Sequence, residues 1–199
     1  PNSTANIPAH IALPWINAKE PLLRLAIARA GNLLSPADQK NHLSKLLSDK
    51  YKAIRVATAN QVLSLPDMNS EQLTNAFKEL LTYNDINSWR GEGNLNQSMV
   101  HAAKGKMTKA IESLKNAIEV DPYFEPSYVN LSDIYRNLGD KTNEQATFKQ
   151  AITAMPNSAV LHYSYGLYQI RNQEKMASVQ SFQKAVKLAP DNSQYAYIY

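Results

Sequence analysis

Three prolines at a fixed interval constrain the fold of this chain more than any other feature of its sequence. Pro122, Pro156 and Pro190 follow one another at intervals of 34 residues. Proline has no backbone N–H and cannot continue a helix, and a self-similar period of this length is typical of stacked supersecondary units. The spacing therefore predicts a series of helical hairpins, each ended by a proline.

Other residue classes follow the same period. A turn position, a small position and a large apolar position recur as Gly105, Gly139 and Gln173, as Ala117, Ala151 and Ala185, and as Leu114, Phe148 and Phe182. Glycine permits the left-handed backbone conformation that ends a helix. We therefore expect two helices in each unit, with the turn position between them.

These units resemble the tetratricopeptide repeat, whose pattern combines aromatic, Leu-Gly, Tyr, Ala, Phe and Pro positions. The middle unit is the clearest, and its matching residues are Tyr128, Leu131, Tyr135, Leu138, Gly139, Phe148, Ala151 and Pro156. The third unit has His162, Tyr165, Gly166, Ser178, Phe182, Ala185 and Pro190, whereas the first has Asn94, Gln97 and His101 where the family prefers bulkier residues. The resemblance implies three units, at 91–124, 125–158 and 159–192, and a truncated capping helix at 193–199. Glu144 replaces the family's small alanine, which predicts looser helix packing in the middle unit.

The front section, residues 1–66, contains a weaker repeat. Residues 21–28 align with residues 52–59, which places Arg24 and Arg55 at equivalent positions 31 residues apart. This pattern resembles HEAT-type repeats, and we expect a second helix from Ala37 to Leu47 with Ser35 as its N-cap. A connecting helix is expected within residues 67–90. It should begin near Asn69 or Ser70 and carry Leu73, Phe77, Leu80 and Leu81 at helical spacing.

The predicted fold is therefore all-α, a right-handed α-solenoid of helical hairpins in which HEAT-like repeats are followed by three tetratricopeptide units. No long linker rich in Gly, Ser or Pro separates the two arrays, so we expect one continuous solenoid. The first residue is not methionine and the chain ends in an amphipathic stretch. We therefore expect a piece of a longer protein.

Charge and hydropathy argue against several classes of partner. Residues 1–66 carry a net charge of +5 and the remainder −1. The basic residues of the front section come without interleaved aromatics or a nucleic-acid motif, so we interpret them as a solvated face and keep nucleic-acid binding as a weak alternative; they are Lys40, Lys45, Lys50, Lys52 and Arg55. No apolar run approaches the roughly 20 residues that cross a bilayer, so no membrane insertion is expected.

Several catalytic and metal-binding chemistries lack the residues that they need. The chain has no cysteine, which removes thiolate catalysis, zinc–thiolate sites and covalent haem attachment. His10, His42, His101 and His162 are scattered without the spacing of metal ligands, and Gly91-Glu92-Gly93 lacks the lysine of a phosphate loop and is interpreted as a weakened helix start. We predict no enzyme activity, no cofactor and no small-molecule substrate.

A binding surface is predicted on the first helix of each unit, because these helices line the concave side of stacked hairpins. A protein or peptide partner is expected there, with asparagines for backbone amides, arginines for carboxylates and apolar anchors. The predicted groove residues are Asn96, Met99, Val129, Asn130, Asp133, Arg136, Asn137, Tyr163, Leu167 and Arg171.

A closer resemblance concerns the order of the parts. A HEAT-like section followed by tetratricopeptide units with Tyr128-Val129-Asn130-Leu131 and Leu188-Ala189-Pro190-Asp191-Asn192 resembles the C-terminal region of bacterial multihaem c-type cytochromes. The resemblance implies a periplasmic location and, as an alternative function, an accessory or docking domain for a haem domain outside this chain. The Cys-x-x-Cys-His motif that would hold haem does not occur here.

Overall fold

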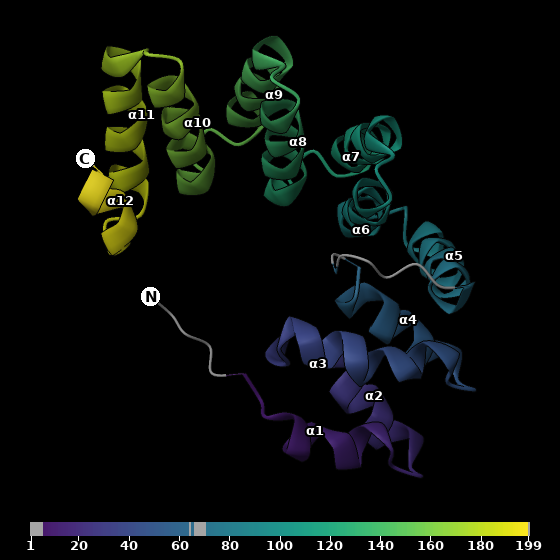
Figure 1. Cartoon of the computed structure of the whole chain (residues 1–199). Coiled ribbons are helices and arrows are strands. Elements are labelled where there is room, and N and C mark those ends of the chain that lie inside the picture. Colours follow the sequence, from purple (N-terminus) through teal and green to yellow (C-terminus); the bar gives the residue numbers. More distant parts are fainter. Residues whose placement is uncertain (1–5, 64, 66–70, 199) are drawn as a thin grey trace. The chain divides into compact units, whose positions relative to one another are not determined.

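The computed structural model describes residues 6–63, 65 and 71–198 of the 199-residue chain. All regular elements in these ranges are helices, and none is a strand, so the predicted all-α class is confirmed. The chain divides into two compact units, residues 1–86 and 87–199. Figure 1 shows the order of the helices along the chain.

The first unit consists of short helices around one apolar core. Its elements are α1 (Ala9–Ile16), α2 (Pro21–Arg29), η1 (Gly31–Leu33), α3 (Pro36–Asn41), η2 (Leu43–Ser48), α4 (Lys52–Gln61) and α5 (Glu71–Ile86). Helix α2 packs between α1 and α4, and α4 packs on α5. Ala28, Leu34, Leu43 and Ile54 lie in the core with at most 2% of their surface exposed.

The helix expected from Ala37 to Leu47 is interrupted. Its start is as predicted, because the Ser35 hydroxyl accepts a bond of 3.1 Å from the Asp38 backbone N–H. The α-helix ends at Asn41, His42 adopts φ −121°, and a 3₁₀-helix follows. Three residues per turn place Leu43 and Leu46 on the same side, and both side chains are buried in the core. The 3₁₀-helix therefore contributes Leu43 and Leu46 to the core of the first unit.

The two arginines that align in sequence make equivalent contacts. Arg24 Nη1 donates to the Ala18 carbonyl at 2.7 Å, and Arg55 Nη1 donates to the Asp49 carbonyl at 2.6 Å, each six residues upstream. Arg24 Nε binds Asp49 Oδ2 at 2.6 Å, and Arg55 binds both carboxylate oxygens of Glu79 at 2.8 and 2.6 Å. The 31-residue repeat is thus a repeat of contacts as well as of sequence.

The predicted connecting helix corresponds to α5, which packs on α4 within the first unit. Leu73, Phe77 and Leu80 are buried and Leu81 is half-buried, as the helical spacing indicates. The predicted start at Asn69 or Ser70 lies outside the described residues. A continuous solenoid through both units stays a prediction.

The second unit consists of three successive helical hairpins and a short last helix (Figure 1). The hairpins are α6 (Gly91–Ala103) with α7 (Met107–Val120), α8 (Glu125–Asn137) with α9 (Lys141–Ala154), and α10 (Ala159–Arg171) with α11 (Lys175–Leu188); α12 spans Ser193–Ile198. The turn residues Gly105, Gly139 and Gln173 have φ of 68°, 72° and 64°. The predicted left-handed turn inside each unit is therefore present three times.

Two glycines at the predicted helix start also pack closely against neighbouring residues. A helix does begin at Gly91, but Gly91 and Gly93 are both buried. A Cβ atom on Gly91 would lie 2.8 Å from Phe124 Cδ1, and one on Gly93 would collide with the Asn87 carbonyl. The predicted helix start at Gly91 is confirmed, and close packing accounts for glycine at both positions.

Glu144, at the position of the family's alanine, is 3% exposed and accepts a hydrogen bond from Arg171 of α10. Helices α8 and α9 approach each other less closely than the helices of the other two hairpins. The larger side chain thus separates the two helices of its own hairpin and links α9 to the following repeat.

Candidate functional site

The first helices of the three hairpins lie next to one another. Helix α8 contacts both α6 and α10, whereas the second helices α7, α9 and α11 do not pack closely together within the described residues. The row of first helices is therefore the tighter one, and the stack curves toward it. These helices carry all the residues predicted to form a groove.

On α6 and α8 the predicted residues divide into apolar and polar groups. Met99 is 46% exposed and Asn96 is half-buried, whereas Val129 packs against the core cluster that includes Leu131. Val129 therefore contributes to the stability of the repeat as well as to the face. Met99 is the more accessible apolar side chain.

The polar residues of α8 form a ridge on the same face. Asn130 Nδ2 donates to the Pro126 carbonyl at 2.8 Å, which leaves its carboxamide oxygen to accept. Asp133 and Arg136 form an ion pair of 2.9 Å, and both side chains are nearly half exposed. Asn137, at the end of the helix, is exposed. The ridge therefore offers donors and acceptors to a polypeptide backbone.

Two of the predicted residues on α10 are engaged within the unit. The Tyr163 ring lies 4.7 Å from the ring of Tyr195 and 5.8 Å from that of Phe182, between centroids. Its hydroxyl accepts from Gln194 Nε2 at 3.3 Å. Arg171 Nη2 lies 2.5 Å from Glu144 Oε1. Tyr163 therefore holds α12 in place and Arg171 pairs with a buried carboxylate, while Leu167 is half-buried.

A second groove lies between α7 and α9, and the sequence analysis did not anticipate it. Its volume is about 480 Å³, its floor includes Tyr128, Leu131 and Tyr135, and its walls include Lys115 and Gln150. The periodic pattern identifies the floor residues as core residues. It gives no signal for the gap that opens where the second helices diverge.

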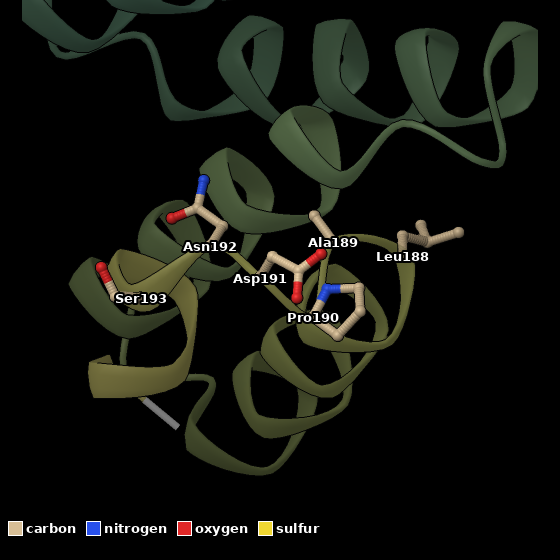
Figure 2. Close-up of a pocket in the computed structure, with 6 residues that line it drawn as sticks. All are labelled: Leu188, Ala189, Pro190, Asp191, Asn192 and Ser193. Atoms are coloured by element: carbon tan, nitrogen blue, oxygen red, sulfur yellow. The ribbon is translucent and has the colours of Figure 1, made fainter.

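A hollow of about 600 Å³ lies at the turn from α11 to α12. Residues 188–193 line it and are drawn as sticks in Figure 2. Asn192 Oδ1 accepts a bond of 3.1 Å from the Gln194 backbone N–H, and Pro190 follows the end of α11. These residues serve to end one helix and start the next. No set of polar side chains converges there to define a ligand.

His10 and His42 belong to the first unit, and His101 and His162 belong to the second. The ring nitrogen Nε2 of His162 lies 2.9 Å from the Pro156 carbonyl, and His42 lies 3.9 Å from Asp38. In the described part of the chain no group of three His, Asp or Glu side chains is placed to share a metal ion. None of the described helices combines the length and apolarity needed to span a bilayer.

The basic residues of the front section have internal partners at two positions. Arg55 is paired with Glu79 at 2.6 Å, and the Lys50 ammonium lies 4.9 Å from the centre of the Tyr51 ring. Arg55 and Lys50 are therefore less available to pair with the phosphates of a nucleic acid.

Comparison with known proteins identifies the repeat. Residues 92–124 and 125–158 each match the tetratricopeptide repeat family model, and no curated protein matches the chain. The chain therefore contains tetratricopeptide repeats. The third predicted unit, 159–192, lies beyond the matched residues, and its α10–α11 hairpin has the same order of helix, left-handed turn and helix.

Similar solved structures agree with this fold. A thermophilic tetratricopeptide repeat protein of Thermus thermophilus, TTC0263, is 17% identical, with 96% of this chain and 97% of that chain covered and a TM-score of 0.56. A MamA protein is 16% identical with 94% of each chain covered and a TM-score of 0.53. MamA MSR-1 C2 is 13% identical, with 91% and 98% covered and a TM-score of 0.53. At these identities the likeness concerns the fold alone.

Proposed function

We propose that this chain is a non-catalytic scaffold that binds a partner polypeptide along the face formed by α6, α8 and α10. The observation that carries the proposal is the row of first helices, in which α8 contacts both neighbours. Helix α8 presents exposed polar side chains, and Met99 of the adjoining α6 is also exposed. An extended peptide or a helix fits such a row, because its side chains can meet apolar anchors and its backbone can meet amides.

The predicted residues differ in how available their side chains are to a partner. Met99 and Asn137 are exposed, and the Asp133–Arg136 pair is open enough to water that rearranging it costs at most about 1 kcal/mol. Tyr163 and Arg171 would have to leave internal partners. The partner therefore draws its binding energy mainly from the α6 and α8 part of the face.

A displayed peptide library provides a ligand for the test. Peptides selected on the full chain are measured by calorimetry against a variant with Met99, Arg136 and Asn137 changed to alanine. The matched control changes Met176, Lys149 and Asn116, which are exposed on the second helices. We expect at least about tenfold weaker binding for the first variant and little change for the control. Equal affinities of the two variants would contradict binding along α6, α8 and α10.

The alternative function, a docking domain of a periplasmic multihaem c-type cytochrome, stays a proposal that rests on the sequence resemblance at Tyr128–Leu131 and Leu188–Asn192. It predicts repeated Cys-x-x-Cys-His motifs in the reading frame upstream of Pro1 and export of the full protein to the periplasm. A start codon directly upstream of Pro1, without such motifs, would end this alternative.

A further inference from the structure

The turn from α6 to α7 carries a concentrated positive charge. Lys104, Lys106 and Lys109 follow His101 within nine residues, and we call these four residues the basic turn. Lys106 and Lys109 are exposed, and neither forms an ion pair within the residues described. The acids of the same hairpin lie mostly at its other end, where Glu92 is in the first turn of α6 and Glu119 lies near the end of α7.

The groups of the basic turn act on one another. Burial, followed by the charges of Lys109, Lys106 and Lys104, lowers the pKa of His101, and Glu112 opposes them. Burial and Lys106 also lower the pKa of Lys104. His101 Nδ1 is buried without a hydrogen-bond partner. Glu112 is thus the acid that counters the lysine charges at His101.

The position of these lysines also costs stability. Lys106 is the N-cap of α7 and Lys109 lies in its first turn, where no acidic residue is present. Positive charges at a helix N-terminus are unfavourable. The equivalent residue of the second repeat, Asp140, accepts a bond of 3.0 Å from the Asn143 N–H, and Glu174 takes this position in the third. Because these lysines are unfavourable at the start of α7, their presence indicates a function beyond the stability of the fold.

We propose that the basic turn docks an acidic segment of a partner polypeptide, whose carboxylates pair with Lys106 and Lys109. Carboxylates complement both the lysine charges and the adjacent helix terminus. Duplex DNA recognition commonly uses about six to ten phosphate contacts, and anionic membranes are recognised by about four to eight clustered cations. Three lysines at one turn are too few for either surface and fit a short acidic segment.

The inference deepens the proposed function by assigning a chemistry to the partner, and it rests on that function only in taking the partner to be a polypeptide. The basic turn shares no residue with the groove variant, which changes Met99, Arg136 and Asn137. Variants at the two places therefore test the two proposals independently.

The test uses the full chain and a fluorescein-labelled peptide of alternating glutamate and glycine, with fluorescence anisotropy at low salt. The variant Lys106→Glu/Lys109→Glu should weaken binding by at least about tenfold. The control Lys149→Glu/Lys184→Glu makes the same change in net charge on α9 and α11 and should retain most of the affinity. Because acids favour the start of α7, the first variant should also have a higher urea midpoint, which separates lost binding from lost folding.

Four results would overturn the inference. The first is equal weakening in both charge variants, which would indicate an effect of net charge alone. The second is no peptide binding even at low salt. The third is tighter binding of duplex DNA or of phosphatidylserine vesicles than of the peptide, with the same dependence on Lys106 and Lys109. Loss of peptide affinity only on changing Met99, Arg136 and Asn137 would also contradict the basic turn while leaving the groove in place.

Discussion

The guanidinium of Arg24 and the carboxylate of Asp49 form an ion pair across 25 residues of sequence, with Nε 2.6 Å from Oδ2. Only 12% and 6% of the two side chains are exposed. The Asp49 backbone carbonyl accepts a second bond from Arg55. Asp49 therefore joins the two equivalent arginines, and with them α2 and α4, into one packed unit.

Replacing Asp49 by asparagine should destabilise the first unit by about 2 kcal/mol, because it leaves a shielded guanidinium without its counter-charge. Trp15 of α1 is the tryptophan of this unit, so its fluorescence in a Trp89→Phe background reports urea unfolding there. The control Glu79→Gln removes the acid of a pair whose side chains are 23% and 30% exposed. It should cost about 1 kcal/mol or less. A larger loss for Glu79→Gln than for Asp49→Asn would contradict this ranking.

The same two acids predict how stability depends on pH. Burial opposes ionisation of Asp49, but the bonds from Arg24 and from the Tyr51 amide hold its pKa below the usual value. The bonds from Arg55 lower the pKa of Glu79. A lowered pKa in the folded state stabilises the fold above the unfolded pKa, about 4 for these groups, and the gain is lost as the pH falls through the folded value. Urea midpoints should therefore fall below about pH 4, and less steeply for Asp49→Asn. An identical pH profile for wild type and variant would rule out Asp49 as a cause.

The buried pair of Glu144 and Arg171 predicts an asymmetry between two substitutions. Arg171→Ala leaves a carboxylate that is 3% exposed without its cation and should cost about 2–3 kcal/mol. Glu144→Ala leaves an arginine that is 38% exposed, restores the alanine of the repeat pattern, and should cost about 1 kcal/mol or less. Chemical denaturation of the two single variants and of the double variant gives the interaction energy between Glu144 and Arg171. Equal losses of stability for the two single variants would contradict the predicted asymmetry.

Gln173 occupies a turn conformation, φ 64°, that glycine takes in the other two hairpins. This left-handed backbone conformation destabilises a residue other than glycine by about 1 kcal/mol or more. Gln173→Gly should therefore stabilise the second unit by about 1 kcal/mol, and Gly139→Ala should destabilise it by a similar amount. Thermal unfolding that shifts the same way for both substitutions would contradict this explanation.

Much of the second unit could be predicted because local chemistry fixes it. Proline at 34-residue intervals ends each hairpin, and the turn glycines have the conformation that glycine favours. The break at His42 and the close approach of Gly91 to Phe124 could not be predicted. Both depend on which residues meet across the core, and helical periodicity carries no information on that.

The candidate site was predicted unevenly for a related reason. Repeat position identifies which residues lie on the first helices, and the structure places Met99, Asp133 and Arg136 there with exposed side chains. Repeat position does not reveal that Tyr163 packs against Tyr195 of α12 or that Arg171 reaches α9. Both contacts come from residues particular to this chain, at Tyr195 and Glu144, and not from the shared pattern.

The central claim, a polypeptide bound along α6, α8 and α10, is tested most directly by photo-crosslinking. A photoreactive amino acid replaces Met99 on α6 or, in the matched variant, Met176 on α11, which is 82% exposed. Each protein is irradiated with a peptide selected on the wild type, and the crosslinked fraction is measured by mass spectrometry. The account predicts efficient crosslinking at Met99 and background levels at Met176. Crosslinking at Met176 that equals or exceeds that at Met99 would contradict it.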